Sequence, residues 1–139
     1  MIVLDTNVVS EPMKARADRT VIKWLDAQNP ETLYLTATSL AELMAGIDTL
    51  PEGKRKQGLA SGLAKLLSVL FGPRILPFGE PAAIIFGSLN AKAKAAGYSI
   101  SFADGQIAAI ASQHGFAVAT RDAVPFLAAG INVIDPWLE

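Results

Sequence analysis

Residues 1–12 read MIVLDTNVVSEP, where three apolar residues run directly into an acid. The apolar run predicts a short buried strand over residues 2–4, and Asp5 stands at its end. An ionised carboxylate is costly to bury without a partner. Asp5 is therefore expected either to cap the backbone of the turn that follows or to bind a ligand at the end of the strand. For a lone Asp after a strand, a cap or turn is the more common role.

The rest of the chain repeats this strand pattern between longer helical patterns. Short apolar runs predict further strands over residues 33–35, 75–76, 117–120 and 132–134. Because strands that alternate with helices are joined by crossover connections, they pair in parallel. We therefore predict one α/β domain over residues 1–139, with a mainly parallel sheet of four to five strands between two layers of helices. Helices are expected from Asp18 to 28, from Thr38 or Ser39 to 50, over 54–71, from Pro81 to 97, from Ser101 to 114, and around Phe126 and Leu127.

Composition limits the kinds of chemistry that the chain can perform. It has no Cys and one His, which excludes disulfides, thiol nucleophiles and thiolate zinc sites and predicts a cytoplasmic protein. We expect no export signal and no membrane span, since no stretch approaches the roughly 20 apolar residues that a spanning helix needs. The net charge of −1 means that nucleic-acid binding would depend on local charge or metal ions. A mean hydropathy of +0.35 predicts apolar surface that a partner covers.

Three acids are placed by the sequence pattern where a ligand could bind, and a fourth is not. Asp122 follows the strand over 117–120, so two strands of the predicted sheet end in acids, at the edge where parallel sheets bind ligands. Asp104 lies in the first turn of the helix that Ser101 caps, on its apolar face. Glu42 lies opposite the apolar arc of its helix. The pattern alone predicts that the Glu42 side chain faces solvent.

If these carboxylates converge, their charges need a cation. Two unit charges about 4 Å apart repel by about 4 kcal/mol at an effective dielectric constant of 20. Protonation or a divalent cation would relieve this repulsion, and carboxylate oxygens without thiolates or clustered imidazoles select Mg²⁺ or Mn²⁺. Such an ion suits hydrolysis of phosphodiesters without a nucleophilic side chain. Asn7 and Thr120 are candidate supporting residues that orient the carboxylates and the substrate.

Four sequence motifs together resemble the PIN-domain ribonucleases. They are V-L-D-T-N at residues 3–7, S-L-A-E-L at 39–43, A-D-G-Q-I-A-A-I-A at 103–111 and V-A-T-R-D at 118–122. More narrowly, the chain resembles the VapC-type toxins of bacterial toxin–antitoxin pairs, and within them the FitB-like branch. The similarity covers the whole chain and includes the ending N-V-I-D-P-W.

This resemblance implies a PIN-like three-layer α/β/α fold and the activity of an Mg²⁺- or Mn²⁺-dependent endoribonuclease, the toxin of a type II toxin–antitoxin system. The family's acidic quartet corresponds to Asp5, Glu42, Asp104 and Asp122, which would bind the metal, so the resemblance moves Glu42 into the site. It also implies a homodimer and a small antitoxin that binds promoter DNA. The helices over residues 40–71 are a candidate surface for the antitoxin.

Two other hypotheses remain open from the sequence. A phosphoacceptor receiver module also gathers acids around Mg²⁺, but it requires an acceptor Asp after a middle strand and a Lys after the last. Here Pro77 follows the third predicted strand and Asp135 the fifth, which argues against it. An inactive binding subunit that retains the fold is the other hypothesis. The complete acidic quartet disfavours it.

Outside the quartet, the best candidate for contacting RNA is Arg121. It is the residue directly before Asp122, so its position predicts contact with substrate phosphate. Trp24 and Trp137 are interpreted as packing or interface residues, because platforms for base stacking ordinarily occur together with a basic groove.

Overall fold

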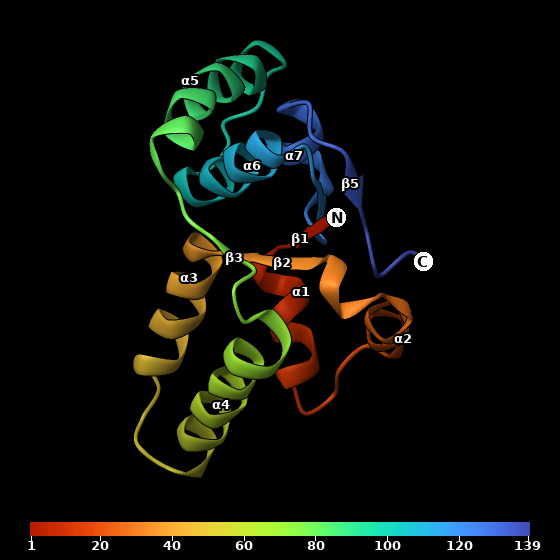
Figure 1. The fold of residues 1–139 in the computed structure, drawn as a ribbon, viewed down its shortest axis with the longest axis vertical. Coiled ribbons are helices and arrows are strands. Elements are labelled where there is room, and N and C mark those ends of the chain that lie inside the picture. Colours follow the sequence, from red (N-terminus) through yellow and green to blue (C-terminus); the bar gives the residue numbers. More distant parts are fainter.

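The computed structural model describes residues 1–139 as one parallel sheet between two layers of helices (Figure 1). The five strands lie in the order β3-β2-β1-β4-β5, and every neighbouring pair is parallel. The predicted three-layer α/β/α fold is therefore confirmed. The strands are β1 (Ile2–Leu4), β2 (Leu33–Thr36), β3 (Ile75–Leu76), β4 (Ala117–Ala119) and β5 (Val133–Ile134).

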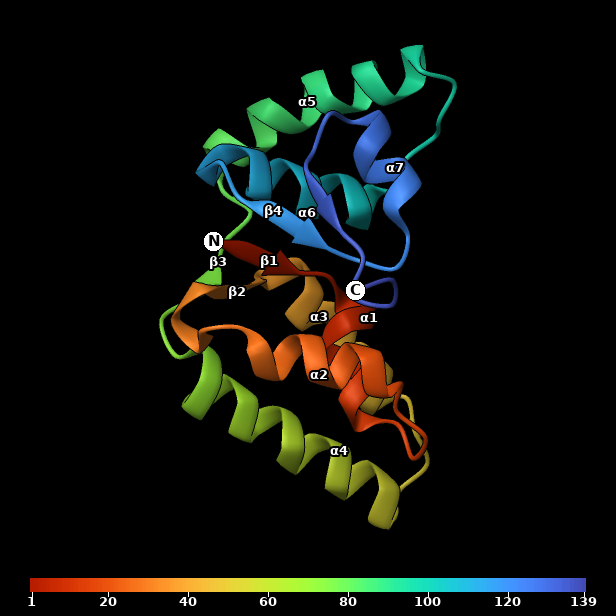
Figure 2. The same ribbon diagram turned by 90° about the vertical axis from the view of Figure 1, so that its right-hand side faces the viewer.

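Helices cover both faces of the sheet, as Figures 1 and 2 show from two directions. Val3 and Val118 pack in the cluster on the side of α5, α6 and α7. Leu4 and Leu35 pack in the cluster on the side of α1 to α4. Because both faces are buried, the strands have no polar face, which explains their uninterrupted apolar runs. The helices are α1 (Thr6–Ser10), α2 (Arg19–Ala27), α3 (Ala37–Asp48), α4 (Lys54–Lys65), α5 (Glu80–Ala95), α6 (Phe102–His114) and α7 (Ala123–Ala128), with short helical turns η1 (Glu11–Met13), η2 (Pro30–Thr32) and η3 (Leu66–Phe71).

Two helix starts differ from the sequence prediction. The chain enters α1 directly after β1, where no helix is predicted, because five residues are too few to produce a helical period. The predicted start of α3 at Thr38 or Ser39 is wrong. Thr36 caps this helix, since its Oγ1 accepts a hydrogen bond from the Ser39 backbone N–H at 3.0 Å. The helix predicted over 54–71 is confirmed as α4 followed by the π-helical turn η3.

A buried acid, Glu11, accepts hydrogen bonds from residues of the loop between η1 and α2. Glu11 is 3% exposed, and its side chain accepts hydrogen bonds from the Asp18 backbone N–H and from Lys14 Nζ, both at 3.1 Å. The Asp18 hydrogen bond is the main reason that the pKa of Glu11 lies below its usual value. Glu11 therefore has a structural role that does not involve the acids at the strand ends.

Helices α5 and α6 approach closely at a glycine. A Cβ atom on Gly105 would lie 2.5 Å from the ring of Phe86 on α5. A larger residue at this position would displace the ring or the helix. Gly105 thus lets α6, which carries Asp104 in its first turn, pack tightly against its neighbour. None of the helices combines the length and apolar character needed to cross a membrane.

The order of the strands creates a switch point in the sheet. The chain leaves β1 for β2 on one side, whereas β4 returns to pair with β1 on the other side. In open parallel sheets such a point leaves a crevice at the carboxyl ends of the two strands, where ligands bind. Asp5 follows β1 and Asp122 lies shortly after β4, so both acids flank this crevice.

Candidate active site

Asp5 is a buried carboxylate with both of its oxygens held by hydroxyl or backbone donors. The residue is 5% exposed. Oδ1 accepts a hydrogen bond from the Thr6 backbone N–H at 2.8 Å, which caps α1, and Oδ2 accepts one from Thr120 Oγ1 at 2.7 Å. Burial raises the pKa of Asp5 to about 6 from its ordinary 3.8, with smaller contributions from the Asp104 and Glu42 charges, and the two hydrogen bonds only partly oppose this. The cap and the candidate ligand are thus the same residue.

Thr120 connects the ends of the two central strands. Its hydroxyl donates to Asp5 and accepts a hydrogen bond from the Asp122 backbone N–H at 3.0 Å. Asn7 makes a second, longer link, because its Oδ1 accepts from the Arg121 backbone N–H at 3.4 Å. These contacts are those expected of supporting residues that fix the relative positions of the acids.

Glu42 lies at the exposed rim of the site. Its side chain faces solvent, as the helical pattern predicts, but Oε1 accepts a hydrogen bond from Thr6 Oγ1 at 2.8 Å. Thr6 directly follows Asp5, so this bond attaches α3 to the start of α1. The prediction from the helical pattern that Glu42 faces solvent is therefore confirmed, and the hydrogen bond to Thr6 places this exposed side chain next to Asp5.

Asp104 is half-buried in the first turn of α6. Ser101 caps this helix as predicted, since its Oγ accepts from the Asp104 backbone N–H at 3.1 Å. The pKa of the Asp104 carboxyl is raised, first by burial and then by the charges of Glu42 and Asp122, while the Ser101 hydroxyl partly opposes the shift. Asp104 thus shares an electrostatic environment with the other acids.

Asp122 occupies the N-cap position of α7, but its side chain makes no capping hydrogen bond. Capping of α7 by its side chain therefore does not explain the position of Asp122. Its carboxylate is exposed and close enough to Asp104 to raise the pKa of that group. All four acids named from the sequence lie around the switch point.

The donor set fits a hard divalent cation, although it does not form a closed coordination shell. No three acidic or histidine side chains converge tightly enough to enclose an ion. Every donor is a carboxylate oxygen, which is the ligand type that Mg²⁺ and Mn²⁺ prefer. Each carboxylate oxygen of Asp5 keeps acceptor capacity beyond its present hydrogen bond. Burial raises the pKa of Asp5 and also that of the half-buried Asp104, and a cation bound between these acids would oppose both shifts.

Sequence reasoning missed two contacts that fix the helices around the site. One is the Thr6–Glu42 hydrogen bond, for which the only signal is the position of Thr6 directly after Asp5. The other joins Thr38 Oγ1 on α3 to Gln106 Oε1 on α6 at 2.7 Å, and no local pattern indicates it. This bond lies one turn from Glu42 and within one turn of Asp104, so it holds together the two helices that carry these acids.

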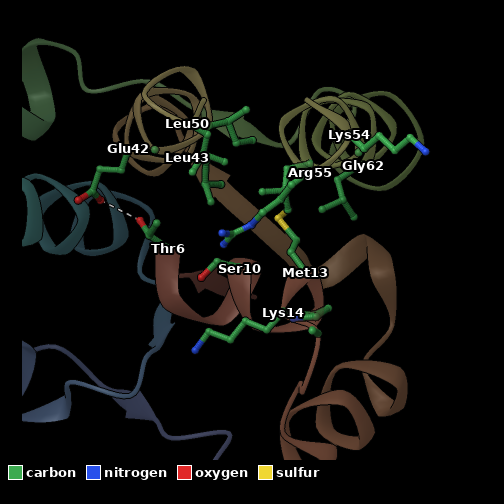
Figure 3. Close-up of a pocket in the computed structure, with 17 residues that line it drawn as sticks. Thr6, Ser10, Met13, Lys14, Glu42, Leu43, Leu50, Lys54, Arg55 and Gly62 are labelled. Atoms are coloured by element: carbon green, nitrogen blue, oxygen red, sulfur yellow. Dashed lines mark hydrogen bonds between the residues drawn. The ribbon is translucent and has the colours of Figure 1, made fainter. Parts of the chain in front are cut away.

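A groove of about 990 Å³ begins at the rim of the site and runs between α1, α3 and α4. Thr6 and Glu42 line one end, and apolar side chains such as Leu43 form part of the wall. Figure 3 shows Met13 and Arg55 directed into the groove and Lys54 pointing away from it. The groove therefore combines apolar and basic surface next to the acids.

Fold and site together define a class of protein: an open parallel α/β/α sheet whose candidate site consists of carboxylates supported by hydroxyl groups. Comparison with known sequences identifies the family. A profile of the PIN domain matches residues 2–130, and the chain belongs to the PIN domain family. The resemblance seen in the four sequence motifs is thus confirmed.

Relatives of the chain match it over nearly its whole length. It is 51% identical over 138 residues to "VapC ribonuclease Y4jK" of Sinorhizobium fredii, covering 99% of this chain and 98% of the relative. It is 46% identical over 137 residues to "Toxin FitB" of Neisseria gonorrhoeae, covering 99% of both. Among solved structures, "Structure of FitAB bound to IR36 DNA fragment" contains a chain that matches with a TM-score of 0.94 and 44% identity, covering 99% of this chain and 96% of that one.

Proposed function

We propose that this protein is a divalent-metal-dependent endoribonuclease that hydrolyses RNA phosphodiester bonds and acts as the toxin of a type II toxin–antitoxin system. The observation that carries the proposal is Asp5, a buried acid with a raised pKa at the switch point, beside the charges of Asp104 and Glu42. Membership of the PIN domain family and the relatives' names of ribonuclease and toxin support it. We expect it to act in the cytoplasm, where RNA is the available substrate.

Within this proposal, each site residue has a distinct task. Asp5 and Asp104 would be the main ligands of Mg²⁺ or Mn²⁺, and Glu42 and Asp122 would complete the site. Such an ion polarises the phosphate and lowers the pKa of water, which supplies a nucleophile at neutral pH. Thr120 keeps the Asp5 carboxylate in one orientation through its 2.7 Å hydrogen bond, so the ligand does not need to reorganise when an ion binds.

The test of this proposal is RNA cleavage by the purified protein. We expect cleavage with Mn²⁺ or Mg²⁺ and none after EDTA treatment, with activity restored by excess metal. Cleavage that persists in EDTA would contradict the metal-dependent mechanism. A folded protein that cuts no RNA yet still represses its promoter together with an antitoxin would support the inactive binding subunit instead.

We propose that the groove between α3 and α4 holds a segment of the antitoxin. The resemblance to VapC-type toxins makes the helices over residues 40–71 a candidate surface for the antitoxin, and residues of this range line much of the groove. Its apolar wall and the inward-facing Arg55 suit a segment that carries apolar side chains and at least one acid (Figure 3). A segment in this position would also reach the rim of the site at Glu42, which explains how binding would inhibit the toxin.

Arg55→Glu tests this surface. The variant should bind the cognate antitoxin at least about tenfold more weakly than wild type does, because charge reversal places like charges together in the groove. The measurement is the dissociation constant from calorimetry or surface plasmon resonance. Lys94→Glu on the exposed side of α5 is the matched control and should bind as wild type does. Equal weakening by the two variants would indicate a general charge effect and exclude the groove.

We also propose a homodimer. Ile84 on α5 and Phe102 at the start of α6 are 70% and 67% exposed, an unusual amount for large apolar side chains on neighbouring helices. Burying them against a second copy would remove this apolar surface from water. Sedimentation equilibrium should give the mass of two chains, and a single-chain mass at micromolar concentration would contradict the proposal.

A further inference from the structure

Arg121 directly precedes Asp122, one of the four acids, but its side chain forms an ion pair with none of them. Its side chain is exposed and lies between Thr120 and Asp122 in the sequence. The chain contains two ion pairs, Lys14–Glu11 and Lys56–Glu52, and neither involves Arg121. Instead, the guanidinium carbon lies 5.1 Å from the centroid of the Trp137 ring. This placement over an aromatic face is a cation–π contact, and it leaves the N–H donors of Arg121 without a partner in the protein.

Trp137 is held in place by a turn of the backbone and by packing against the core. Its backbone N–H donates to Asp135 Oδ1 at 2.9 Å, and the Leu138 N–H donates to the Asp135 carbonyl at 3.1 Å, so the segment after β5 forms a tight turn. Pro136 is buried. The indole ring is half-buried and packs against the hydrophobic cluster that contains Leu4 at the end of β1. The position of the ring is therefore set by the same core that positions Asp5.

Two hydrogen bonds fix the backbone at Arg121. Its N–H donates to Asn7 Oδ1 at 3.4 Å, and the next N–H along the chain, that of Asp122, donates to Thr120 Oγ1 at 3.0 Å. Backbone anchoring fixes where the side chain starts, but a long side chain retains many rotamers. Without the Trp137 ring, the guanidinium would be free to turn toward the carboxylate of the adjacent Asp122.

We propose that Trp137 is a positioning residue that keeps the guanidinium of Arg121 outside the acidic quartet, where it binds a phosphate of the RNA next to the cleavage point. This inference rests on the proposed ribonuclease function. A guanidinium presents several N–H donors in one plane, which suits two-point binding of phosphate, and an aromatic ring beneath it limits the rotamers it must give up. Trp137 itself does not contact the substrate.

The test measures steady-state cleavage of a short RNA with Mn²⁺ by four variants: Trp137→Leu, Trp137→Phe, Arg121→Gln and the double variant Trp137→Leu/Arg121→Gln. Arg121→Gln should raise KM about tenfold and reduce the salt dependence of RNA binding by about one phosphate contact, with kcat within about twofold of wild type. Trp137→Leu should raise KM about three- to fivefold, in line with the strength of a cation–π contact, and Trp137→Phe less because the ring is kept.

The double variant decides whether the two residues act together. If Trp137 acts through Arg121, the double variant should have the same KM as Arg121→Gln alone. Trp24→Leu is the matched control, since Trp24 is half-buried against the same hydrophobic cluster and carries no cation on its ring. It should lower stability but leave KM unchanged. All assays are run at a temperature at which circular dichroism shows each variant to be folded.

Two outcomes would overturn the inference while leaving the ribonuclease function intact. One is a Trp137→Leu effect on KM that multiplies with that of Arg121→Gln, and the other is an equal rise in KM for Trp24→Leu. A wild-type protein that cuts no RNA would overturn the proposed function and this inference together.

Discussion

We expect Asp104→Asn to lower the rate of Mn²⁺-dependent RNA cleavage by about 100-fold or more while the protein stays folded. Losing a residue that merely supports a metal ligand costs about 10- to 100-fold, so losing a main ligand should cost at least the upper value. The substitution keeps the size of the side chain, and the Ser101 cap uses the backbone N–H of residue 104, which is unchanged. Initial rates on a fluorogenic RNA measure the effect.

The matched control is Asp26→Asn, which makes the same chemical change at an exposed position of α2. It should cleave RNA at the wild-type rate. An Asp104→Asn rate within about threefold of wild type would remove Asp104 from the set of ligands, because substitution of a metal ligand has a much larger effect.

We expect Asp5→Asn to stabilise the metal-free protein at pH 7.5, even though it removes a residue of the candidate site. The folded state raises the pKa of Asp5 from 3.8 to about 6. Such a shift costs the folded state up to about 3 kcal/mol above pH 6, where the buried carboxylate is ionised. An Asn has no charge to bury, and its side-chain oxygen can still accept the Thr6 hydrogen bond that caps α1. We expect a gain of about 1 to 3 kcal/mol in the free energy of unfolding.

The difference in the free energy of unfolding between Asp5→Asn and wild type should depend on pH. Between about pH 4 and 6 the folded protein binds a proton on Asp5 that the unfolded chain has released, so wild-type stability falls as the pH rises through this window. The gain from Asp5→Asn should therefore be smallest below pH 4 and complete above pH 6. Urea unfolding in EDTA at several pH values measures it, with Asp26→Asn as the control. A destabilised Asp5→Asn protein at pH 7.5, or a difference independent of pH, would contradict the assignment.

The strands and most helices could be predicted because their signals are local. Apolar runs, Asp18 as a cap and the breaks after residues 71 and 97 are all visible within short windows. The five-residue α1 was missed because its length is too short to show a period. Asp5 and Asp104 were identified as candidates from their unusual positions, one at a strand end and one on an apolar helical face.

Contacts between distant segments could not be predicted in this way. Glu42 lies on an exposed helical face, and only the packing of α3 against α1 brings it to Thr6, 36 residues earlier in the chain. The Thr120–Asp5 bond spans 115 residues and depends on the pairing of β4 with β1. The assignment of Glu42 to the quartet rests on the family resemblance. The contact between Arg121 and Trp137 requires the three-dimensional structure, because it depends on how the chain turns after β5.

The structure shows that the two roles considered for Asp5, helix cap and ligand, do not exclude each other. A cap and a ligand were alternatives from the sequence, but one oxygen caps α1 and the other is fixed by Thr120. Both roles follow from the direct passage of β1 into α1. A buried acid that destabilises the fold is typical of a residue retained for activity and not for stability.

The central claim is that the acids at the switch point bind a divalent cation, and titration of Mn²⁺ into the metal-free protein by calorimetry tests it most directly. We predict saturable binding to wild type and at least about tenfold weaker binding to both Asp5→Asn and Asp104→Asn, with Asp26→Asn unchanged. Equal Mn²⁺ affinity for wild type, Asp5→Asn and Asp104→Asn would contradict the claim.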